Sequence, residues 1–254
     1  MMIPQTPFYY YDTALLQATL DAIHKEIAQY PNYHVHYALK ANANPKLLHL
    51  IQQAGLGADC VSGGEVQAAI DAGFPADKIV YAGVGKSDRE IQLALHHDIF
   101  CFNVESVPEL QVINELASQE NKVARVCLRI NPDVEAHTHT HIITGMAENK
   151  FGIALKDMLY VVQLANELPH VSFEGLHFHI GSQITNMQDY VALCERVNEI
   201  QFLLNKHGIY PSVINVGGGL GIDYYAPQEH PIANFKAYFN VFEQHLHLRA
   251  NQSL

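Results

Sequence analysis

Short apolar runs alternate along the chain with amphipathic stretches of helical period. Seven apolar runs have the length of a buried strand, and they lie at 33–40, 57–62, 79–83, 99–104, 124–130, 173–180 and 213–216. Helical patterns precede, separate and follow them at 13–28, 45–54, 65–72, 88–97, 108–119, 156–168, 189–207 and 232–249. Strands that alternate with helices in this way indicate right-handed βαβ units and a parallel sheet.

Eight such units would close a barrel, and the seven strands counted here are followed by a helix, where an eighth strand would begin. The pattern therefore predicts an α/β fold, a (β/α)8 TIM-type barrel truncated before its eighth strand. An open doubly wound sheet is consistent with the same rhythm. We assign residues 12–254 to the incomplete barrel and residues 1–11 to a separate N-terminal segment.

Composition narrows the class of protein. Of the 254 residues, 48% are apolar and 16% charged, as in a globular domain. The 26 acidic and 15 basic residues give a net charge of −11, which argues against nucleic acid as a partner and favours a cytoplasmic protein. The sequence has no apolar stretch of about 18 residues, so we expect no membrane span. The cysteines form no C-x-x-C pair, and we expect reduced core thiols at Cys60, Cys101, Cys127 and Cys194.

Lys40 is the first candidate for chemistry. It closes the apolar run 35–39 and is followed at once by the small, polar turn 41–45. In a parallel barrel the active site lies at the carboxyl ends of the strands, where this amine would stand. A lysine in a partly apolar pocket loses its proton more readily and becomes a nucleophile. The simpler interpretation is a strand-end lysine in solvent.

Three successive glycines, Gly217, Gly218 and Gly219, follow the seventh strand. Their backbone amides can converge on an anion, and the loops after strands seven and eight are the usual phosphate site of this barrel. Both nucleotide signatures are incomplete, because Ile222 takes the third glycine position of the dinucleotide fingerprint and Val80 the first of a P-loop. We expect a phosphate group here, with a tight turn as the alternative; a nucleotide is not required.

His177 and His179 end the sixth predicted strand two residues apart, so we expect both on one face of it. Imidazoles there can bind a metal, transfer protons or stack on a flat ring. Two histidines make an incomplete metal site, for which Asp59 or Glu105 would be the third ligand. The tract 137–141, with three alternating histidines, also resembles a metal site, although a solvated loop is the simpler interpretation.

Polar residues gather at the carboxyl ends of the other predicted strands. They are Asp59 and Ser62 after the second strand, Asn103 and Glu105 after the fourth, and Arg129 and Asn131 after the fifth. Each one alone is explained as a loop cap. Their joint position at one end of a barrel indicates an active site.

Together these motifs resemble the alanine-racemase-like, fold type III decarboxylases that use pyridoxal phosphate. The matching stretches run in family order over nearly the whole chain: Tyr37-Ala-Leu-Lys40-Ala-Asn42, Gly57-Ala-Asp59-Cys-Val-Ser62-Gly-Gly-Glu65, Arg129-Ile-Asn131-Pro132, Thr144-Gly145 with Lys150-Phe-Gly152, His177-Phe-His179-Ile-Gly181-Ser-Gln183, and Gly217-Gly-Gly-Leu-Gly221. The segment from His179 to Gln183 is similar to the decarboxylase branch and unlike the racemases.

The resemblance implies a role for each candidate. The catalytic residues would be Lys40, His179 and Asp59: Lys40 would hold pyridoxal 5′-phosphate covalently, His179 would stack on its ring, and Asp59 would lie near the Lys40 amine. Arg129 would approach the ring hydroxyl, and Ser62 belongs to the same cofactor-binding set. The phosphate would be held by Ser182, Gly217, Gly218 and Gly219. No metal is expected.

The resemblance also implies that the chain is the barrel portion of a longer enzyme. In the family, an eighth strand with an acidic residue and an arginine follows, and then a β-rich domain whose residues act across a dimer interface. We expect residues 1–11 to pair with that domain, the full-length enzyme to be a homodimer, and the portion ending at Leu254 to have little or no activity. A missing strand would cost more than the roughly 5–15 kcal/mol that holds a domain folded.

The expected reaction is decarboxylation of an amino acid, with the cofactor as electron sink. We expect meso-2,6-diaminopimelate as substrate and L-lysine as product, as in lysine biosynthesis, and Gln183 favours this choice. Ornithine, arginine, lysine or carboxynorspermidine are alternative substrates. Three other classes remain open: a pyridoxal phosphate protein that releases no CO₂, an aldolase using Lys40 alone, and a metal-dependent barrel hydrolase using His177, His179 and Asp59.

Overall fold

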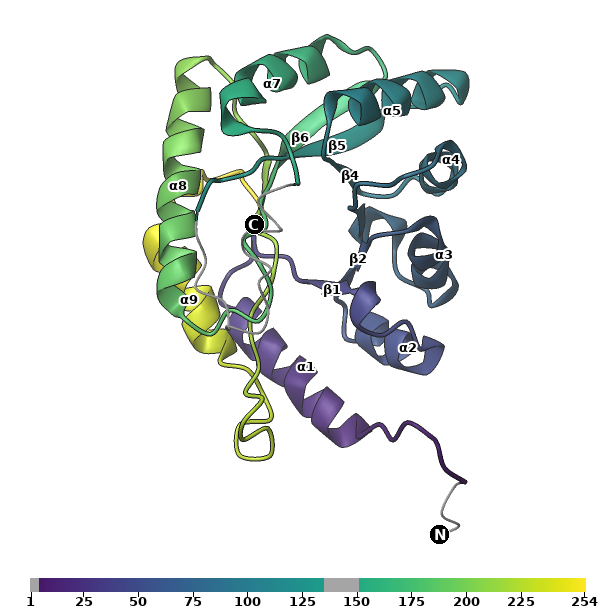
Figure 1. The fold of residues 1–254 in the computed structure, drawn as a ribbon, viewed down its shortest axis with the longest axis vertical. Coiled ribbons are helices and arrows are strands. Elements are labelled where there is room, and N and C mark those ends of the chain that lie inside the picture. Colours follow the sequence, from purple (N-terminus) through teal and green to yellow (C-terminus); the bar gives the residue numbers. More distant parts are fainter. Residues whose placement is uncertain (1–4, 135–150) are drawn as a thin grey trace.

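The computed structural model describes residues 5–134 and 151–254. Seven strands form one parallel sheet in the order β1-β2-β3-β4-β5-β6-β7. They are β1 (His36–Ala38), β2 (Gly57–Cys60), β3 (Ile79–Tyr81), β4 (Cys101–Val104), β5 (Ala124–Arg129), β6 (Val171–His177) and β7 (Val213–Asn215). Figure 1 shows the sheet curling, with helices around its outer side. This is the incomplete barrel that the sequence predicts.

The helices follow the strands in the predicted alternation. They are α1 (Thr13–Ile27), α2 (Pro45–Gln53), α3 (Gly63–Asp71), α4 (Asp88–His96), α5 (Val107–Gln119), α7 (Met158–Glu167), α8 (Met187–Lys206) and α9 (Phe235–His245), with short 3₁₀ helices η1 (Leu39–Ala41), η2 (Ala76–Lys78) and η3 (Leu155–Asp157). Side chains that cap the first turn determine where several of these helices begin. Asp12 accepts hydrogen bonds from the amides of Ala14 and Leu15 at the start of α1, and Ser87 with Glu90 forms a capping box for α4.

Side chains that alternate along the strands build two separate cores. The larger core lies between the sheet and the helices and includes Tyr81 and Phe102. Val80, Cys101 and Cys127 are each adjacent in sequence to a residue of the larger core. Their side chains point to the other face of the sheet, where they form a second, smaller cluster. All four cysteines are free and buried, as expected.

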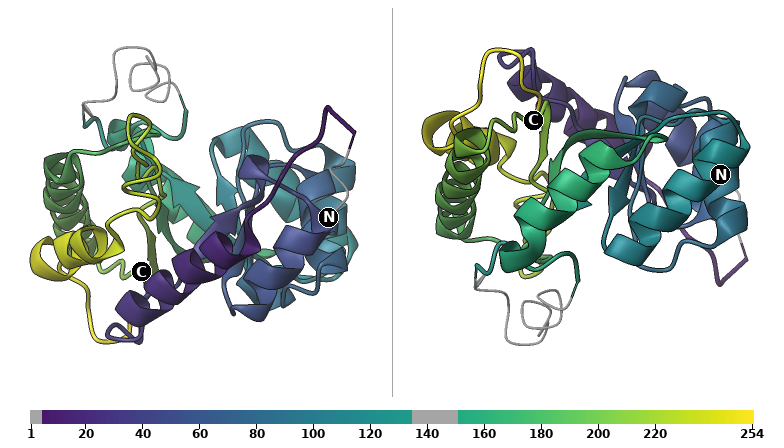
Figure 2. Two further views of the ribbon diagram at one scale, coloured as in Figure 1. Left: turned by 90° about the horizontal axis from the view of Figure 1, so that it is seen from below. Right: turned by 90° about the horizontal axis from the view of Figure 1, so that it is seen from above.

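The two end strands of the sheet, β1 and β7, are connected through residues 252–254. Four backbone hydrogen bonds make the connection: Ser253 N to Ser212 O (2.9 Å), Ile214 N to Ser253 O (2.9 Å), Leu254 N to Asn32 O (2.9 Å) and His34 N to Leu254 O (2.7 Å). Helix α9 ends at His245, earlier than the predicted 249, because the chain turns back toward the sheet (Figures 1 and 2). Residues 252–254 therefore bridge the two edges of the sheet at their amino ends, and we call this connection the seam.

Candidate active site

Lys40 lies in the 3₁₀ helix η1, beyond the end of β1 at Ala38. The turn is braced on both sides: the Tyr37 hydroxyl donates to the Asn42 carbonyl (3.1 Å), and the Asn42 side-chain amide donates to the Tyr11 hydroxyl (3.1 Å). Lys40 itself is exposed. The amine thus stands at the carboxyl end of the barrel, as predicted, but in an open position rather than in an apolar pocket.

Asp59 is the residue of β2 that faces this turn. It pairs in register with Ala38, two residues before Lys40. Burial raises the pKa of the Asp59 carboxyl to about 6, although Lys40 and His179 oppose the rise electrostatically. The carboxyl therefore changes charge near neutral pH, within the electrostatic reach of the candidate nucleophile.

Ser62 is the N-cap of α3 in this structure. Its hydroxyl oxygen accepts a hydrogen bond from the Glu65 amide (3.2 Å), and the Glu65 carboxylate accepts one from the Val61 amide (2.8 Å). This reciprocal capping starts the helix at Gly63, two residues before the predicted 65. The predicted contact between Ser62 and the cofactor remains a prediction beside this capping role.

The glycine run packs against the segment that follows β6. A Cβ atom on Gly217 would come within 2.4 Å of the Phe178 carbonyl oxygen, and one on Gly219 within 2.1 Å of the Gly181 oxygen. Both glycines have positive φ, 72° and 88°, a conformation that favours glycine. A Cβ on Gly218 would meet nothing within 4 Å. The loop is therefore closed against the barrel on one side and open at Gly218.

The open side of this loop offers backbone amides for an anion. The Gly217 amide donates to the Asn215 side chain (2.8 Å). The amides of Gly218 and Gly219, in contrast, donate to no described residue. Ile184 bonds to this loop on both sides, with its amide to the Gly219 carbonyl and its carbonyl to the Gly221 amide, each at 2.8 Å. The predicted phosphate ligands, Ser182 included, thus lie on two adjoining loops.

Gln183 joins the same two loops. Its side-chain amide donates to the Ile222 carbonyl and accepts from the Ile222 amide, and its backbone adopts φ 58°. Both polar ends of the side chain are engaged in the protein itself. The structure therefore gives Gln183 a bracing role, whereas the sequence analysis used it as a signal for substrate choice.

A row of polar side chains crosses the carboxyl ends of β4 to β7. Arg129 pairs in register with His177, and His177 with Asn215. The Arg129 guanidinium donates to the Glu105 carboxylate at 2.9 Å, with the two side chains 11% and 3% exposed. Burial, with a contribution from Arg129, holds the pKa of His177 well below its usual range. Strand β6 ends at His177, so His179 lies beyond the strand and the predicted shared strand face does not extend to it.

Several buried polar atoms beneath this row have no hydrogen-bond partner among the described residues. They are the Tyr81 hydroxyl, both amide atoms of Asn103, one carboxylate oxygen of Glu105 and Nδ1 of His177. A buried polar atom without a partner costs about 1–3 kcal/mol. Their concentration at one end of the barrel is what a site for a polar ligand or ordered water requires.

An ion pair that the sequence analysis did not single out lies behind the row. Lys86 Nζ and Glu109 are 2.6 Å apart, with side chains 1% and 11% exposed. Lys86 also donates to the carbonyls of Gly83 (2.7 Å) and Asn103 (2.9 Å), while Glu109 accepts from the Glu105 amide (2.8 Å). The pair thus fixes the backbone from which Glu105 projects. The spacing of Ser106 and Glu109 is a capping signal, but only the fold reveals the partner lysine.

Metal binding finds no support in the described part of the chain. There, no three or more histidine, cysteine, aspartate or glutamate side chains gather as metal ligands. His177, His179 and Asp59 therefore do not make the metal site that a hydrolase would need. The histidine tract 137–141 and the motif residues Thr144, Gly145 and Lys150 lie outside the described residues.

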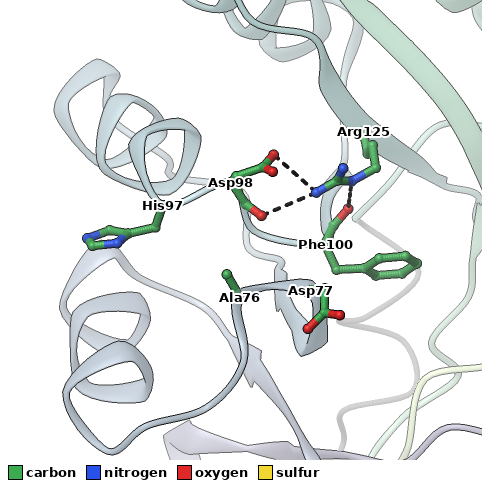
Figure 3. A pocket seen from close by; sticks show the side chains of 6 residues that line it. All are labelled: Ala76, Asp77, His97, Asp98, Phe100 and Arg125. Atoms are coloured by element: carbon green, nitrogen blue, oxygen red, sulfur yellow. Dashed lines mark hydrogen bonds and ion pairs between the residues drawn. The ribbon is translucent and has the colours of Figure 1, made fainter.

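A hollow of about 480 Å³ lies at the opposite end of the sheet, before β3, β4 and β5 (Figure 3). It is lined by Ala76, Asp77, His97, Asp98, Phe100 and Arg125. The Arg125 guanidinium is already bonded to the carboxylate and carbonyl of Asp98 and to the carbonyls of Ile99 and Phe100. None of the candidate site residues lines this hollow. Arg125 thus joins the start of β5 to the residues that precede β4.

Comparison with known proteins decides the family. The family described as "Pyridoxal-dependent decarboxylase, pyridoxal binding domain" matches residues 15–253. The chain belongs to this family. The resemblance to the fold type III decarboxylases is thereby confirmed, and so is the predicted cofactor, pyridoxal 5′-phosphate.

Individual relatives agree with the family. Diaminopimelate decarboxylase of Bacteroides thetaiotaomicron is 61% identical over 250 residues, which cover 98% of this chain and 65% of that protein. Diaminopimelate decarboxylase of Aquifex aeolicus is 40% identical over 89% of this chain and 53% of its own length. The crystal structure of the Helicobacter pylori enzyme complexed with L-lysine superposes with a TM-score of 0.86 at 33% identity, over 98% of this chain and 62% of that one. The chain thus spans about half to two thirds of the length of these relatives.

No helix within residues 5–134 and 151–254 has both the length and the apolar character needed to cross a membrane.

Proposed function

We propose that this chain is the cofactor-binding barrel of an enzyme that decarboxylates meso-2,6-diaminopimelate to L-lysine. The observation that carries the proposal is the 61% identity to a protein named diaminopimelate decarboxylase along nearly the whole chain. Decarboxylation of ornithine, lysine or arginine has weaker support. The lysine/ornithine decarboxylase of Vibrio vulnificus superposes with a TM-score of 0.73 but is only 21% identical, a likeness that concerns the fold alone.

The described residues fit pyridoxal phosphate on three counts. The Lys40 amine is exposed at the mouth of the barrel. The loop at Gly218 presents amides with no described acceptor beside Ser182, which suits a phosphate. The buried atoms without partners at Asn103 and His177 offer donors and acceptors below that position. When bound, the cofactor supplies an electron sink for the electrons released as CO₂ leaves.

The chain's own groups would then orient the reactants and move protons. Lys40 would hold the cofactor and yield it to the substrate amine, with the Asp59 carboxyl within electrostatic reach of Lys40. His179 would flank the ring, and Arg129 would approach its hydroxyl. Fixing the ring plane matters because it selects which substrate bond lies perpendicular to the ring and breaks.

We extend the proposal to the assembly: a cytoplasmic homodimer in which residues 1–11 pack against further parts of the enzyme, with little or no activity for residues 1–254 alone. Three neighbouring aromatic side chains in that segment support a contact surface. Phe8, Tyr9 and Tyr10 are 45%, 89% and 82% exposed. Exposed aromatic groups in such a cluster are typical of an interface.

The proposal is tested by locating the cofactor in the full-length enzyme that contains this chain. Reduction with borohydride followed by peptide mass spectrometry should place the cofactor on Lys40. Lys40→Ala should lose the label and reduce CO₂ release from diaminopimelate at least about a thousandfold, because the covalent step is gone. Lys46→Ala, at an exposed lysine on α2, is the matched control and should keep both. A label on another residue would contradict the proposal.

A further inference from the structure

The Glu105 carboxylate holds one side of the Arg129 guanidinium. The guanidinium donates to Glu105 at 2.9 Å, and the ring of Phe151 lies 5.6 Å from the guanidinium carbon on another side. Glu105 is almost fully buried, and its second carboxylate oxygen has no partner among the described residues. A buried carboxylate of this kind is costly unless a cation compensates it. Arg129 supplies this cation at 2.9 Å, so the placement of each of the two buried side chains depends on the other.

We infer that Glu105 is a positioning residue for the cofactor: it fixes the Arg129 guanidinium and balances its charge where that group meets the cofactor ring. The inference rests on the proposed function, because it assumes that pyridoxal phosphate binds at this end of the barrel. Glu105 itself lies behind Arg129 and acts through it.

The backbone of Glu105 is itself held rigidly. Its amide donates to the Glu109 carboxylate, which is paired with the buried Lys86 at 2.6 Å. Lys86 in turn binds the carbonyl of Asn103, two residues before Glu105. A charge that must be held within a fraction of an ångström needs such support from rigid elements. The end of β4 thus presents Glu105 to Arg129 from a fixed point.

The charges that face Arg129 come from three other strands. Glu105 follows β4, Asp59 lies in β2 and is influenced by Arg129, and His177 lies beside Arg129 in β6, with His179 just beyond it. His177 is neutral at physiological pH because burial disfavours its charged form. Among these described groups, Glu105 accepts a hydrogen bond from the guanidinium at 2.9 Å. Its removal would therefore change the electrostatic field at Arg129 directly.

The test uses the full-length holoenzyme and compares Glu105→Gln, Glu105→Asp and Glu109→Gln with the wild type. Two quantities are measured: the dissociation constant of pyridoxal phosphate, by titrating the apoenzyme, and the pH midpoint of the bound cofactor's visible absorbance. Glu105→Gln removes the charge but keeps the size. The midpoint should fall by about one pH unit because Arg129 then favours the anionic ring oxygen more strongly, and the dissociation constant should rise about tenfold as the guanidinium loosens.

The other variants separate charge from packing. Glu105→Asp keeps the charge but withdraws it by one methylene, so the dissociation constant should rise several-fold while the midpoint stays near the wild-type value. Glu109→Gln removes the charge paired with Lys86 but keeps an oxygen that can accept from the Glu105 amide, so it should lower thermal stability without moving the midpoint. Equal midpoint shifts in Glu105→Gln and Glu109→Gln would overturn the inference. So would wild-type affinity in Glu105→Asp, a measurement that remains informative if Glu105→Gln does not fold.

Failure of the proposed function gives a different result. In that case the wild-type enzyme itself binds no pyridoxal phosphate and shows no visible band. A wild-type enzyme that binds the cofactor, together with a Glu105→Gln variant that titrates and binds identically, would leave the function standing and refute the role of Glu105.

Discussion

The wall of the barrel, by which we mean strands β3, β4 and β5, is stabilised in a different way from the seam. Every residue of β3 and β4 is buried, and behind them lies the Lys86–Glu109 ion pair. At the seam all three residues of β1 are only half-buried, as are the two outer residues of β7. Residues 252–254 join the start of β7 to the segment that precedes β1 by four backbone hydrogen bonds. The wall is stabilised by packing and buried charge, and the seam mainly by backbone pairing.

The residues of the candidate site also form two groups, one on the wall and one on the strands that meet at the seam. The fixed charges, Glu105 and Arg129, follow or end strands of the packed wall. Lys40, which would exchange partners during the proposed reaction, follows β1, and the loop at Gly218 follows β7, so both lie beyond the carboxyl ends of the two strands at the seam. A rigid element suits a charge that must stay in place, while a less packed one tolerates movement. The comparison therefore predicts larger stability effects in the wall than in the seam.

The largest expected effect is at the buried ion pair of the wall. Lys86→Met leaves the Glu109 carboxylate buried without its cation, and we expect a loss of about 3–5 kcal/mol in the free energy of unfolding. The measurement is denaturant unfolding of the full-length protein. Arg196→Met on α8 is the control, because it breaks an exposed pair with Glu199 (2.8 Å) that is worth about 1 kcal/mol or less.

A second variant sharpens this result. Lys86→Met combined with Glu109→Leu removes both charges and should recover much of the lost stability, since an apolar pair of similar volume replaces a desolvated ion pair. A single Lys86→Met variant as stable as the Arg196→Met control would show that the wall does not depend on this pair.

The next effect is a pH dependence at the seam, through His36 of β1. His36 is half-buried as a residue, but its ring nitrogen Nδ1 is buried. This burial lowers the pKa of His36 to about 4, against about 6.5 in an unfolded chain. The unfolded state then binds the proton first as the pH falls. Stability from this group is complete above about pH 6.5 and declines down to about pH 4, by about 3 kcal/mol in all.

This prediction is checked by unfolding the wild type and His36→Gln across pH 4 to 7 and taking the difference. Subtraction matters because other groups also titrate: the raised pKa of Asp59, about 6, acts in the opposite sense and reduces stability as the pH rises from about 4 through 6. His247→Gln, at an exposed histidine, should follow the wild type throughout. A His36→Gln curve parallel to the wild type would contradict the prediction.

The wall could be predicted from the sequence more fully than the seam. Mostly apolar runs such as 99–104 have one stable place in a parallel sheet, and serine caps such as Ser87 and Ser106 mark where helices begin. The seam depends on pairing between Asn32 and Leu254 across almost the whole chain. No local pattern encodes such a contact, so the short strand β1 and the early end of α9 were not foreseen.

The candidate site, too, could be predicted from the sequence only in part. Strand-end polarity and glycine spacing placed Lys40, Asp59, Arg129 and Gly217 at one end of the barrel, because parallel strands share their carboxyl edge. Contacts between side chains on different strands could not be derived from local sequence patterns. Glu105 was weighed as a metal ligand, and only the fold shows that it binds Arg129.

The smallest expected effect is at Gln252 in the seam. This side chain is 1% exposed, donates to the Pro211 carbonyl (3.0 Å) and accepts from the Arg249 amide (3.2 Å). Gln252→Ala leaves the Arg249 amide without its acceptor, while the Pro211 carbonyl keeps its hydrogen bond from the Arg249 guanidinium. The substitution should cost about 1–3 kcal/mol, measured by denaturant unfolding beside Gln119→Ala, an exposed glutamine on α5 that should change stability by about 0.5 kcal/mol or less. A Gln252→Ala loss as large as that of Lys86→Met would mean that the seam is as tightly built as the wall, and the division of the site between a fixed and a mobile side would lose its physical basis.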